Sequence, residues 1–595
     1  MYLRKLSICN FRKLKSVEIP FEPGLNILVG PNNVGKTTVI DALRALLSNQ
    51  DEPTPRLSED DIYRPKQGPP AGAIEFHYVF DGLTPDDEAD FLSALVPNTE
   101  GELEAHIFVR YSDPDKSTGR LRAKRWGGLH EENTLSLEMM EDLRGVYLPP
   151  LRDAALGLRP NRSSQLARLL HILVDDAGKL GIDAALKGLD EELKQHPPLI
   201  NLQAAITDRH SGMVGARLAQ SLEVNLSGSD FKRFSSRLAL MVDAFEIEQN
   251  GLGFNNLIFM AVVLSEMASN QESAYRGLIV EEPEAHLHPQ LQAVLLRYLE
   301  NIAIQAATTE TPEHNAPTSP PNPRVQVFVT SHSPNFASIA KLSSLICLTE
   351  TDACVTSFQP HSVVFGKGKR EKLERYLDVT RAELFFARRI IFVEGAAELM
   401  LVSVLAQKCG HSLRDHAVSL ISVEGLNFDC FLPLFGKGRI CIPVAVITDA
   451  DPSEEVGGKA QALYPKSGEA IQVSDNTQAM LKLSDEFVGV FHGVKTLEYD
   501  LALYASNRTA MLKTLKLLHP KIGIEVEASV VAATDDAAKA KALFSGMFER
   551  SSNNVSKGRF GQALAQELSD SGAGCDVPPY VRKAIEHVCG NVPPP

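Results

Sequence analysis

The sequence lacks any long uninterrupted run of apolar residues. Its first residues, MYLRKLSICNFRKL, alternate apolar with polar side chains. A signal peptide needs a continuous apolar core, and a membrane-spanning helix needs about 18 or more apolar residues. We therefore expect a cytoplasmic protein that does not contact a membrane.

Cysteine is scarce and scattered. None of the eight cysteines belongs to a C-x-x-C pair: Cys9, Cys347, Cys354, Cys409, Cys430, Cys441, Cys575 and Cys589. This spacing excludes a zinc ribbon and a small disulfide framework. We expect reduced thiols with structural roles.

An excess of positive charge is also missing, since the formal net charge is -15. This argues against a protein that coats nucleic acid without specificity, because phosphate contacts need Lys and Arg. A local basic groove would still suffice to bind DNA. One candidate segment contains Lys367, Lys369, Arg370, Lys372, Arg375, Arg381, Arg388 and Arg389. The alternative is a solvated helix face, because Glu371, Glu374 and Glu383 are interleaved.

What is present describes an ordinary globular chain. Its 595 residues are 44% hydrophobic and 23% charged, with a mean hydropathy of -0.09. A chain of this length divides into about three or four packed units.

Periodicity predicts the order of these units. Strands are expected at 2–9, 14–20, 25–29, 73–80, 104–111 and 145–148, with a helix at 36–47. Helical periodicity replaces this pattern from about 163 to 222, with an interruption at Pro197-Pro198. Residues 306–324, rich in Pro, Thr, Asn and Ser, are expected to form an exposed, mobile loop. A second parallel α/β pattern begins at Arg389, with strands at 390–393, 418–423 and 444–447, and helices follow from about 497. The predicted units are 1–162, 163–228, 229–380 and 381–595.

A phosphate-binding loop is the most specific motif. Residues 30–37, GPNNVGKT, match G-x-x-x-x-G-K-[ST] between a predicted strand and helix. Backbone N–H groups and the helix N-terminus favour phosphate, Lys36 reaches the terminal phosphates and Thr37 ligates magnesium. We assign nucleotide contacts to Asn32, Gly35, Lys36, Thr37 and Thr38.

A buried strand ending in acids follows, as a Walker B motif requires. In LIVEE, at 278–282, Glu281 is predicted to hold magnesium and Glu282 to orient the attacking water. His332, after the next strand, resembles the switch histidine of ABC ATPases. His286 and His288 have metal-like spacing, but this segment in such ATPases meets the partner subunit.

Two further loops resemble ATPase elements. Asn250 and Gly251, in QNGLGFN before a predicted helix at 256–269, occupy the place of an ABC signature loop, although its serine is missing; a simple glycine turn is the alternative. Asn10-Phe11-Arg12 resembles the N-F-R turn of SMC-like and RecF-like ATPases, where Arg12 would lie near nucleotide. Because ABC sites close between two subunits, we expect a homodimer or higher homo-oligomer that binds ATP with one magnesium ion.

A second acidic site is predicted in the last third of the chain. One buried strand ends at Glu394, with Glu398 four residues later, and another delivers Asp449 and Asp451. Carboxyl ends of parallel strands meet at one sheet edge. Clustered carboxylates repel unless a cation lies between them, and oxygen ligands suit Mg²⁺ or Mn²⁺. Two ions could support phosphodiester hydrolysis.

Three later residues are candidates to complete this site. Glu498 and Ser453 are possible metal ligands, and Lys557 is a possible stabiliser of phosphate charge. Considered alone, each would be an ordinary surface residue.

The E-G and D-x-D pattern is that of a Toprim domain. Combined with an ABC-type head carrying EEPEAHLHP at 281–289, it resembles the OLD (overcoming lysogenization defect) family, which includes Gabija A-like proteins. The resemblance implies an α/β fold: an SMC/RecF-like ABC ATPase with an inserted helical dimerisation unit, then a Toprim domain with helical additions. It also implies a two-metal DNA endonuclease, with Glu498, Lys557 and Ser453 as site residues. Phage defence and a helicase-like partner follow from Gabija-type members.

Two other functions remain open from the sequence. A topoisomerase or primase-like enzyme would need a nucleophilic tyrosine domain or a zinc module, and neither is found. An ATP-controlled DNA clamp without nuclease activity would not need the full set of Toprim acids.

Overall fold

The computed structural model describes the chain from 1 to 595, except residues 48–53, 66–68, 70–71, 116, 151–156, 162–163, 216, 226–229, 244, 270–272, 306–324, 352–353, 457–458, 571–574 and 591–595. The predicted mobile loop at 306–324 and the predicted boundaries near 162 and 228 lie outside the described residues.

An antiparallel sheet forms the first layer. Its order is β2-β1-β4-β6-β5, with β7 paired to β6. Along β1, Leu3, Leu6, Ile8 and Phe11 are buried. This spacing gives the sheet one apolar face, broken by a register shift between Leu3 and Lys5. The strands are β1 (Tyr2–Phe11), β2 (Leu14–Pro20), β4 (Ile74–Asp81), β5 (Leu95–Pro97), β6 (Leu103–Ser112) and β7 (Arg122–Gly127).

A second, mainly parallel sheet has the order β14-β13-β3-β12-β11-β8. Only the β13–β14 pair is antiparallel. Every residue of β3 is buried, as expected for a strand covered on both faces. The strands are β3 (Leu25–Val29), β8 (Leu143–Leu148), β11 (Tyr275–Glu281), β12 (Val325–Thr330), β13 (Leu345–Thr351) and β14 (Cys354–Phe358).

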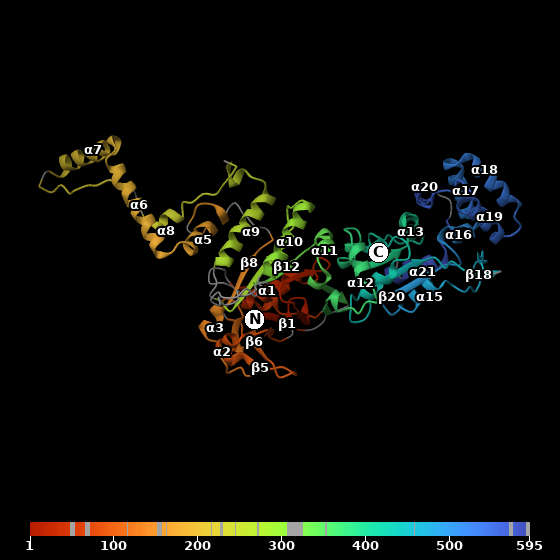
Figure 1. Ribbon diagram of the computed structural model, residues 1–595, viewed down its shortest axis with the longest axis horizontal. Helices are drawn as coiled ribbons and strands as arrows, with labels where there is room; N and C mark the ends of the chain where they lie inside the picture. Colours follow the sequence, from red (N-terminus) through yellow and green to blue (C-terminus); the bar gives the residue numbers. More distant parts are fainter. Residues whose placement is uncertain are drawn as a thin grey trace, which may run out of the picture.

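Alternate residues of β3 face two different hydrophobic cores. Leu28 packs into the core shared with α1 (Lys36–Leu46) and the antiparallel sheet. Ile27 packs into the core formed with α9 (Leu252–Ser269), α10 (Pro289–Gln305) and α11 (Pro334–Ile339). The parallel sheet is therefore the middle layer of this half of the molecule. Two short helices, α2 (Pro85–Asp90) and α3 (Leu137–Asp142), lie beside the antiparallel sheet (Figure 1).

Helices were predicted for the insert at 163–228, and the structure places three there: α5 (Gln165–Leu173), α6 (Asp176–Lys194) and α7 (Pro197–Val214). A short helix, α8 (Phe231–Ser235), follows the predicted insert. Helices α6 and α7 extend away from the rest of the molecule (Figure 1), and neither has a buried residue. Pro197 and Pro198 occupy the first two positions of α7, where a missing N–H costs nothing.

A four-stranded parallel sheet, β16-β15-β17-β20, forms the other half. Its strands are β15 (Arg389–Val393), β16 (Val418–Ser422), β17 (Val444–Thr448) and β20 (Val488–His492). The preceding segment contains α12 (Lys369–Tyr376), and the hairpin β18 (Ser453–Val456) and β19 (Lys459–Ala462) follows β17. The helices are α13 (Ala396–Lys408), α14 (Phe428–Phe431), α15 (Asp475–Leu481), α16 (Leu497–Ala502), α17 (Ala505–Leu518), α18 (Pro520–Ala532), α19 (Asp536–Phe548), α20 (Lys557–Asp570) and α21 (Pro579–Cys589).

The two halves share one hydrophobic core. The core cluster that contains Ile27 and Leu342 continues through Leu384 to Phe392 and Val444. All eight cysteines are free in this structure. Among the described helices, none is long and apolar enough to cross a membrane.

Candidate functional site

The loop between β3 and α1 has the backbone that phosphate binding requires. Gly30 and Gly35 have φ angles of 150° and 112°, in the region that favours glycine. A Cβ on Gly30 would lie 2.5 Å from the carbonyl oxygen of Leu348. Only glycine fits there, so no side chain covers the backbone at this position.

Lys36 folds back over this loop. Its Nζ donates to the carbonyl oxygens of Gly30 at 2.6 Å and Pro31 at 3.1 Å. Burial lowers the pKa of Lys36 to about 8. An incoming phosphate would replace these two carbonyl acceptors with a stronger anionic one.

The Walker B acid lies opposite the loop. Thr37 Oγ1 donates to Glu281 Oε2 at 3.1 Å, and the Tyr147 hydroxyl donates to Glu281 Oε1 at 2.7 Å. Burial raises the pKa of Glu281. The structure thus brings together the hydroxyl and the carboxylate that the motifs assign to one magnesium ion.

Glu282 and His332 also meet. His332 Nε2 lies 3.5 Å from Glu282 Oε1, and Glu282 has a φ of 43°. Burial lowers the pKa of His332, and the Lys36 charge acts in the same direction. A neutral ring beside an acid and a lysine is consistent with a shared nucleotide site.

Two residues here were missed by sequence reasoning. Glu284 Oε1 accepts from the Ser331 hydroxyl and the His332 backbone N–H, both at 2.8 Å, and so fixes the loop that carries His332. Tyr147 positions Glu281. Glu284 stands inside the PEAHLHP segment and had a weak signal, whereas Tyr147 lies outside every motif.

The remaining predicted nucleotide residues differ in their contacts. Arg12 donates to Asp41 at 2.7 Å and Asp61 at 2.8 Å. Asn250 Nδ2 donates to Asn255 Oδ1 at 3.0 Å, near Gly251 at the start of α9. Among the described contacts, none joins Arg12, Asn250 or Gly251 to the phosphate loop. Asn32 is exposed on the loop and Thr38 is buried beneath it.

The second acidic site is built at the carboxyl ends of β15 and β17. Glu394 Oε1 accepts from the Thr448 hydroxyl at 2.7 Å and from the Asp449 backbone N–H at 2.8 Å. Glu398, in the first turn of α13, accepts from the Gly395 N–H at 3.1 Å. Burial raises the pKa of Glu398, and the Glu498 charge raises it further.

Asp449 is the centre of this cluster. Its pKa is well above the ordinary value because of burial and because Glu394 and Glu498 are close. Glu498 is 1% exposed, and its Oε1 has no hydrogen-bond partner among the described residues. Its Oε2 accepts from the Thr496 hydroxyl at 3.1 Å and lies 3.2 Å from Lys557 Nζ. A buried carboxylate oxygen without a donor fits a cation ligand.

The structure therefore gathers five predicted residues: Glu394, Glu398, Asp449, Glu498 and Lys557. Asp451, with a φ of 42°, and Ser453 are exposed on the segment that follows β17. Within the described chain, neither side chain has a hydrogen bond or ion pair to the five.

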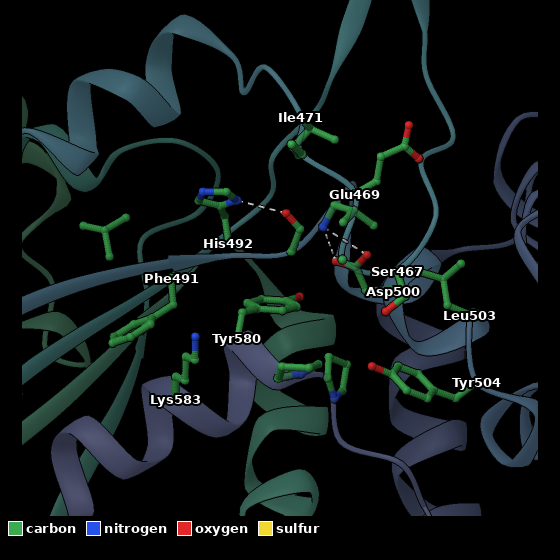
Figure 2. Close-up of a pocket in the computed structure, with 17 residues that line it drawn as sticks. Ser467, Glu469, Ile471, Phe491, His492, Asp500, Leu503, Tyr504, Tyr580 and Lys583 are labelled. Atoms are coloured by element: carbon green, nitrogen blue, oxygen red, sulfur yellow. Dashed lines mark hydrogen bonds between the residues drawn. The ribbon is translucent and has the colours of Figure 1, made fainter.

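A cavity of about 490 Å³ lies on another side of α16 (Figure 2). Asp500 faces it beside Tyr504 and Tyr580, and accepts from the Val494 N–H. The five clustered residues do not line it. It is lined by residues 467–471 and 490–494, with Asp500, Leu503, Tyr504, Pro578, Pro579, Tyr580 and Lys583.

The basic segment ahead of β15 is largely engaged in internal contacts. Lys369 and Lys372 both pair with Asp429, and Arg381 is buried between Asp378 and Glu424. Arg388 donates to the carbonyl oxygen of Asn32 at 3.1 Å. These contacts favour a structural role for most of the segment over a DNA-binding groove.

Family models match both halves of the chain. A model described as AAA ATPase domain matches residues 1–213 and 242–337, and one described as Overcoming lysogenization defect protein-like, TOPRIM domain, matches 385–451. An OLD nuclease from Thermus scotoductus is 26% identical over 411 residues, which cover 66% of this chain and 71% of that protein. Endonuclease GajA from Bacillus cereus is 21% identical over 547 residues, which cover 76% and 77%.

One solved structure is the C-terminal region of an OLD protein from Xanthomonas campestris pv. campestris. It is 29% identical, with a TM-score of 0.24, and the match covers 34% of this chain and 95% of that one. An AAA ATPase domain that spans more than half of the chain, followed by an OLD-like TOPRIM domain, makes this protein a member of the OLD family.

Proposed function

We propose that this protein is a divalent-metal-dependent DNA endonuclease under the control of ATP. The observation that carries the proposal is the buried carboxylate cluster around Asp449. Four acids lie together with one lysine, and the buried Oε1 of Glu498 has no donor among the described residues. Such an arrangement is unfavourable without cations, because the carboxylates repel one another.

Glu394, Glu398, Asp449 and Glu498 are the proposed inner ligands, with the exposed Asp451 and Ser453 completing the coordination from the segment after β17. Oxygen ligands alone suit Mg²⁺ or Mn²⁺. When bound, two such ions supply an activated water and neutralise the leaving oxygen of a phosphodiester.

Lys557 has two proposed tasks in this site. It holds Glu498 in place through their 3.2 Å contact, and it presents a positive charge to the phosphate. Burial acts against that charge, but Glu498 and Asp449 raise the pKa of Lys557 above its ordinary value. The lysine therefore stays protonated.

The ATP half is assigned to the residues around the phosphate loop. Asn32, Gly35, Lys36, Thr37 and Thr38 would contact the nucleotide, with Thr37 and Glu281 on one magnesium ion. Glu282 would orient water, and His332 would contact the terminal phosphate. Asn250 and Gly251 have no described contact with this loop in one chain, so the signature loop is proposed to act on the ATP of a second subunit. Arg12, which donates to Asp41 of α1, is proposed to lie near the nucleotide.

We also propose the units 1–162, 163–228, 229–380 and 381–595, with the helical insert as the dimer contact. DNA is the proposed substrate, the cytoplasm the proposed location and phage defence, alongside a helicase-like partner, the proposed setting. A plaque assay with and without the neighbouring genes tests that setting.

The central test is Asp449→Asn, which keeps the volume and removes the charge. We expect cleavage of plasmid DNA with Mn²⁺ to fall by about a hundredfold or more. ATP hydrolysis and the melting temperature without metal should stay close to wild type. Asp475→Asn, an exposed acid of the same half in the first turn of α15, is the matched control and should cut normally.

Lys36→Ala separates the two sites. It should lose ATP binding, measured with a fluorescent ATP analogue, while metal-dependent cutting persists.

Nicking by Asp449→Asn at the wild-type rate would overturn the assignment of the metal site. Absence of cleavage in the wild type, with ATP-dependent retention of DNA, would favour a clamp.

A further inference from the structure

A second cluster of possible metal ligands lies away from the carboxylates. His411 and His416 belong to the loop between α13 and β16, and Cys589 is the last residue of α21. One ring nitrogen of each histidine and the Cys589 Sγ all lie within 4.8 Å of one another. The edges of a tetrahedral zinc site with nitrogen and sulfur ligands are roughly 3.3 to 3.6 Å long. The three side chains therefore need only a small adjustment to share one ion.

The burial of these side chains is unusual for groups with nothing to bind. His411 is 7% exposed, and its buried Nδ1 has no hydrogen-bond partner among the described residues. Nearly all buried polar atoms are paired, so this nitrogen calls for an explanation. Cys589 is 8% exposed.

The tautomer of His416 is fixed by the backbone. Its Nδ1 lies 2.9 Å from the carbonyl oxygen of Ser412. A carbonyl only accepts, so Nδ1 must carry the hydrogen and Nε2 keeps a free lone pair. Metal-binding histidines are commonly oriented by such a hydrogen bond from the other ring nitrogen.

We propose that His411, His416 and Cys589 form a binding site for a zinc ion that ties the last helix to the loop after α13. Two imidazoles and a thiolate select a borderline or soft ion, whereas the carboxylate cluster selects a hard one. The two sites would therefore hold different metals in one domain, and this inference does not depend on the proposed nuclease activity.

Binding requires the thiol to lose its proton. Burial raises the pKa of the Cys589 thiol, and the nearby Arg389 opposes that effect. Arg389 is itself held by a 2.7 Å hydrogen bond to the His416 carbonyl. On binding, an S–H bond is replaced by a bond from sulfur to the metal, and one proton is released to solvent.

The position of the site defines its role. Helix α21 packs on β15, β17, β20 and α13. Two of these strands lead into Glu394 and Asp449, and α13 carries Glu398. A metal that joins the end of α21 to the end of α13 would hold this helix against the sheet that positions the carboxylates.

The test is a Co²⁺ titration of the untagged full-length protein, with millimolar Mg²⁺ present to occupy the carboxylates. We expect one Co²⁺ per chain with the near-ultraviolet charge-transfer band of a thiolate ligand, displaced by added Zn²⁺. The band should vanish in Cys589→Ser. In His416→Asn the apparent affinity for Co²⁺ should fall at least tenfold. Cys409→Ser, which changes a partly buried cysteine at the end of α13, should keep it.

The wild-type measurement stands even if a variant fails to fold. Absence of the charge-transfer band in the wild type overturns the proposal. Persistence of the band in Cys589→Ser would show that a different thiol binds the ion, and this would also overturn the proposal. Loss of the band in Cys409→Ser would then identify that thiol as Cys409.

Discussion

Glu282 and Asp451 share a backbone feature that sequence motifs do not encode. Each follows closely after a central strand, and each has a left-handed φ, 43° and 42°. A non-glycine residue in this region carries a cost of roughly 1–2 kcal/mol. The chain accepts that strain just after β11 and β17, where the two acids follow the strands that carry Glu281 and lead to Asp449.

His77 makes the stability of the folded protein depend on pH. Its ring stacks on Phe108 at 4.0 Å, and its Nε2 lies 3.0 Å from His106 Nδ1. Burial, together with the His106 and Lys5 charges, lowers the pKa of His77 to about 3. The folded protein thus resists protonation here. The contribution of His77 to the free energy of unfolding is fully present above about pH 6.5, the ordinary pKa of histidine, and is lost as the pH falls from there towards 3.

We therefore expect the melting temperature of His77→Phe to fall less than that of the wild type when the pH is lowered from 7 to 4.5. The measurement is a pair of thermal melts by circular dichroism. His130→Phe, at an exposed histidine, should keep the wild-type pH slope. Equal slopes for His77→Phe and wild type would contradict this account.

Motif residues were predictable because parallel strands bring their carboxyl ends to one edge. Lys36, Thr37 and Glu281 meet in this way, as do Glu394 and Asp449. Tyr147 was not predictable, because its contact with Glu281 depends on β8 lying next to β11. Strand order is a tertiary property without a local signal.

At the scale of elements, the predicted strands at 14–20 and 25–29 match β2 and β3 in full. The strands that were missed include β5, β7, β13, β14, β18, β19 and β20. β20, VGVFH, is short and has a glycine, which weakens the local signal. The interruption between helices expected at Pro197-Pro198 is confirmed, because α6 ends at Lys194 and Pro197 begins α7.

Two glycines of α20 make a matched test of helix packing. A Cβ on Gly561 would lie 2.9 Å from Ala397 Cα on α13, whereas one on Gly558 would meet only Ala396 Cβ at 3.7 Å. We expect Gly561→Ala to destabilise the protein by about 1–3 kcal/mol and to reduce cleavage, because α20 carries Lys557. Gly558→Ala should be neutral or stabilising by about 0.5–1 kcal/mol. Urea unfolding and plasmid cleavage measure both effects, and equal stability of the two variants would contradict the packing argument.

The extended helices α6 and α7 carry apolar side chains that are exposed in a single chain. Leu180, Ile200 and Ile206 are 69%, 51% and 45% exposed. Large exposed apolar surfaces commonly mark interaction sites. We expect the triple change to serine to shift the dimer towards monomer in light scattering. A matched pair, Leu517→Ser with Val531→Ser on α17 and α18, should leave the dimer intact. A wild-type monomer would refute the dimer proposal.

At the scale of the whole molecule, Arg388 connects the two sites. It donates to Asn32 in the phosphate loop, and the next residue begins β15, which ends beside Glu394. We expect Arg388→Ala to bring the ratio of cleavage rates with and without ATP closer to one. Lys13→Ala is the control, since Lys13 donates to the Asn33 carbonyl at 2.8 Å from within the ATPase half. Equal effects of the two variants would argue against a route through β15.

The shared hydrophobic core of the two halves could not be predicted from the sequence. The predicted boundary between 380 and 381 implies separate units, yet Leu373 and Leu377 share a core with Leu384 and Phe392. Hydrophobic periodicity shows which face of an element is buried, but not which neighbour covers it.

The order of strands in the central sheet has a consequence for synthesis on the ribosome. β3 pairs with β12 and β13, which follow it by about three hundred residues, whereas the antiparallel sheet is complete by Gly127. At about 5–20 residues per second, the nascent chain holds the phosphate-loop strand without its partners for roughly 15 to 60 seconds. During that interval β3 is an unpaired apolar edge, so the yield of folded protein should depend on chaperones that shield the first third of the chain.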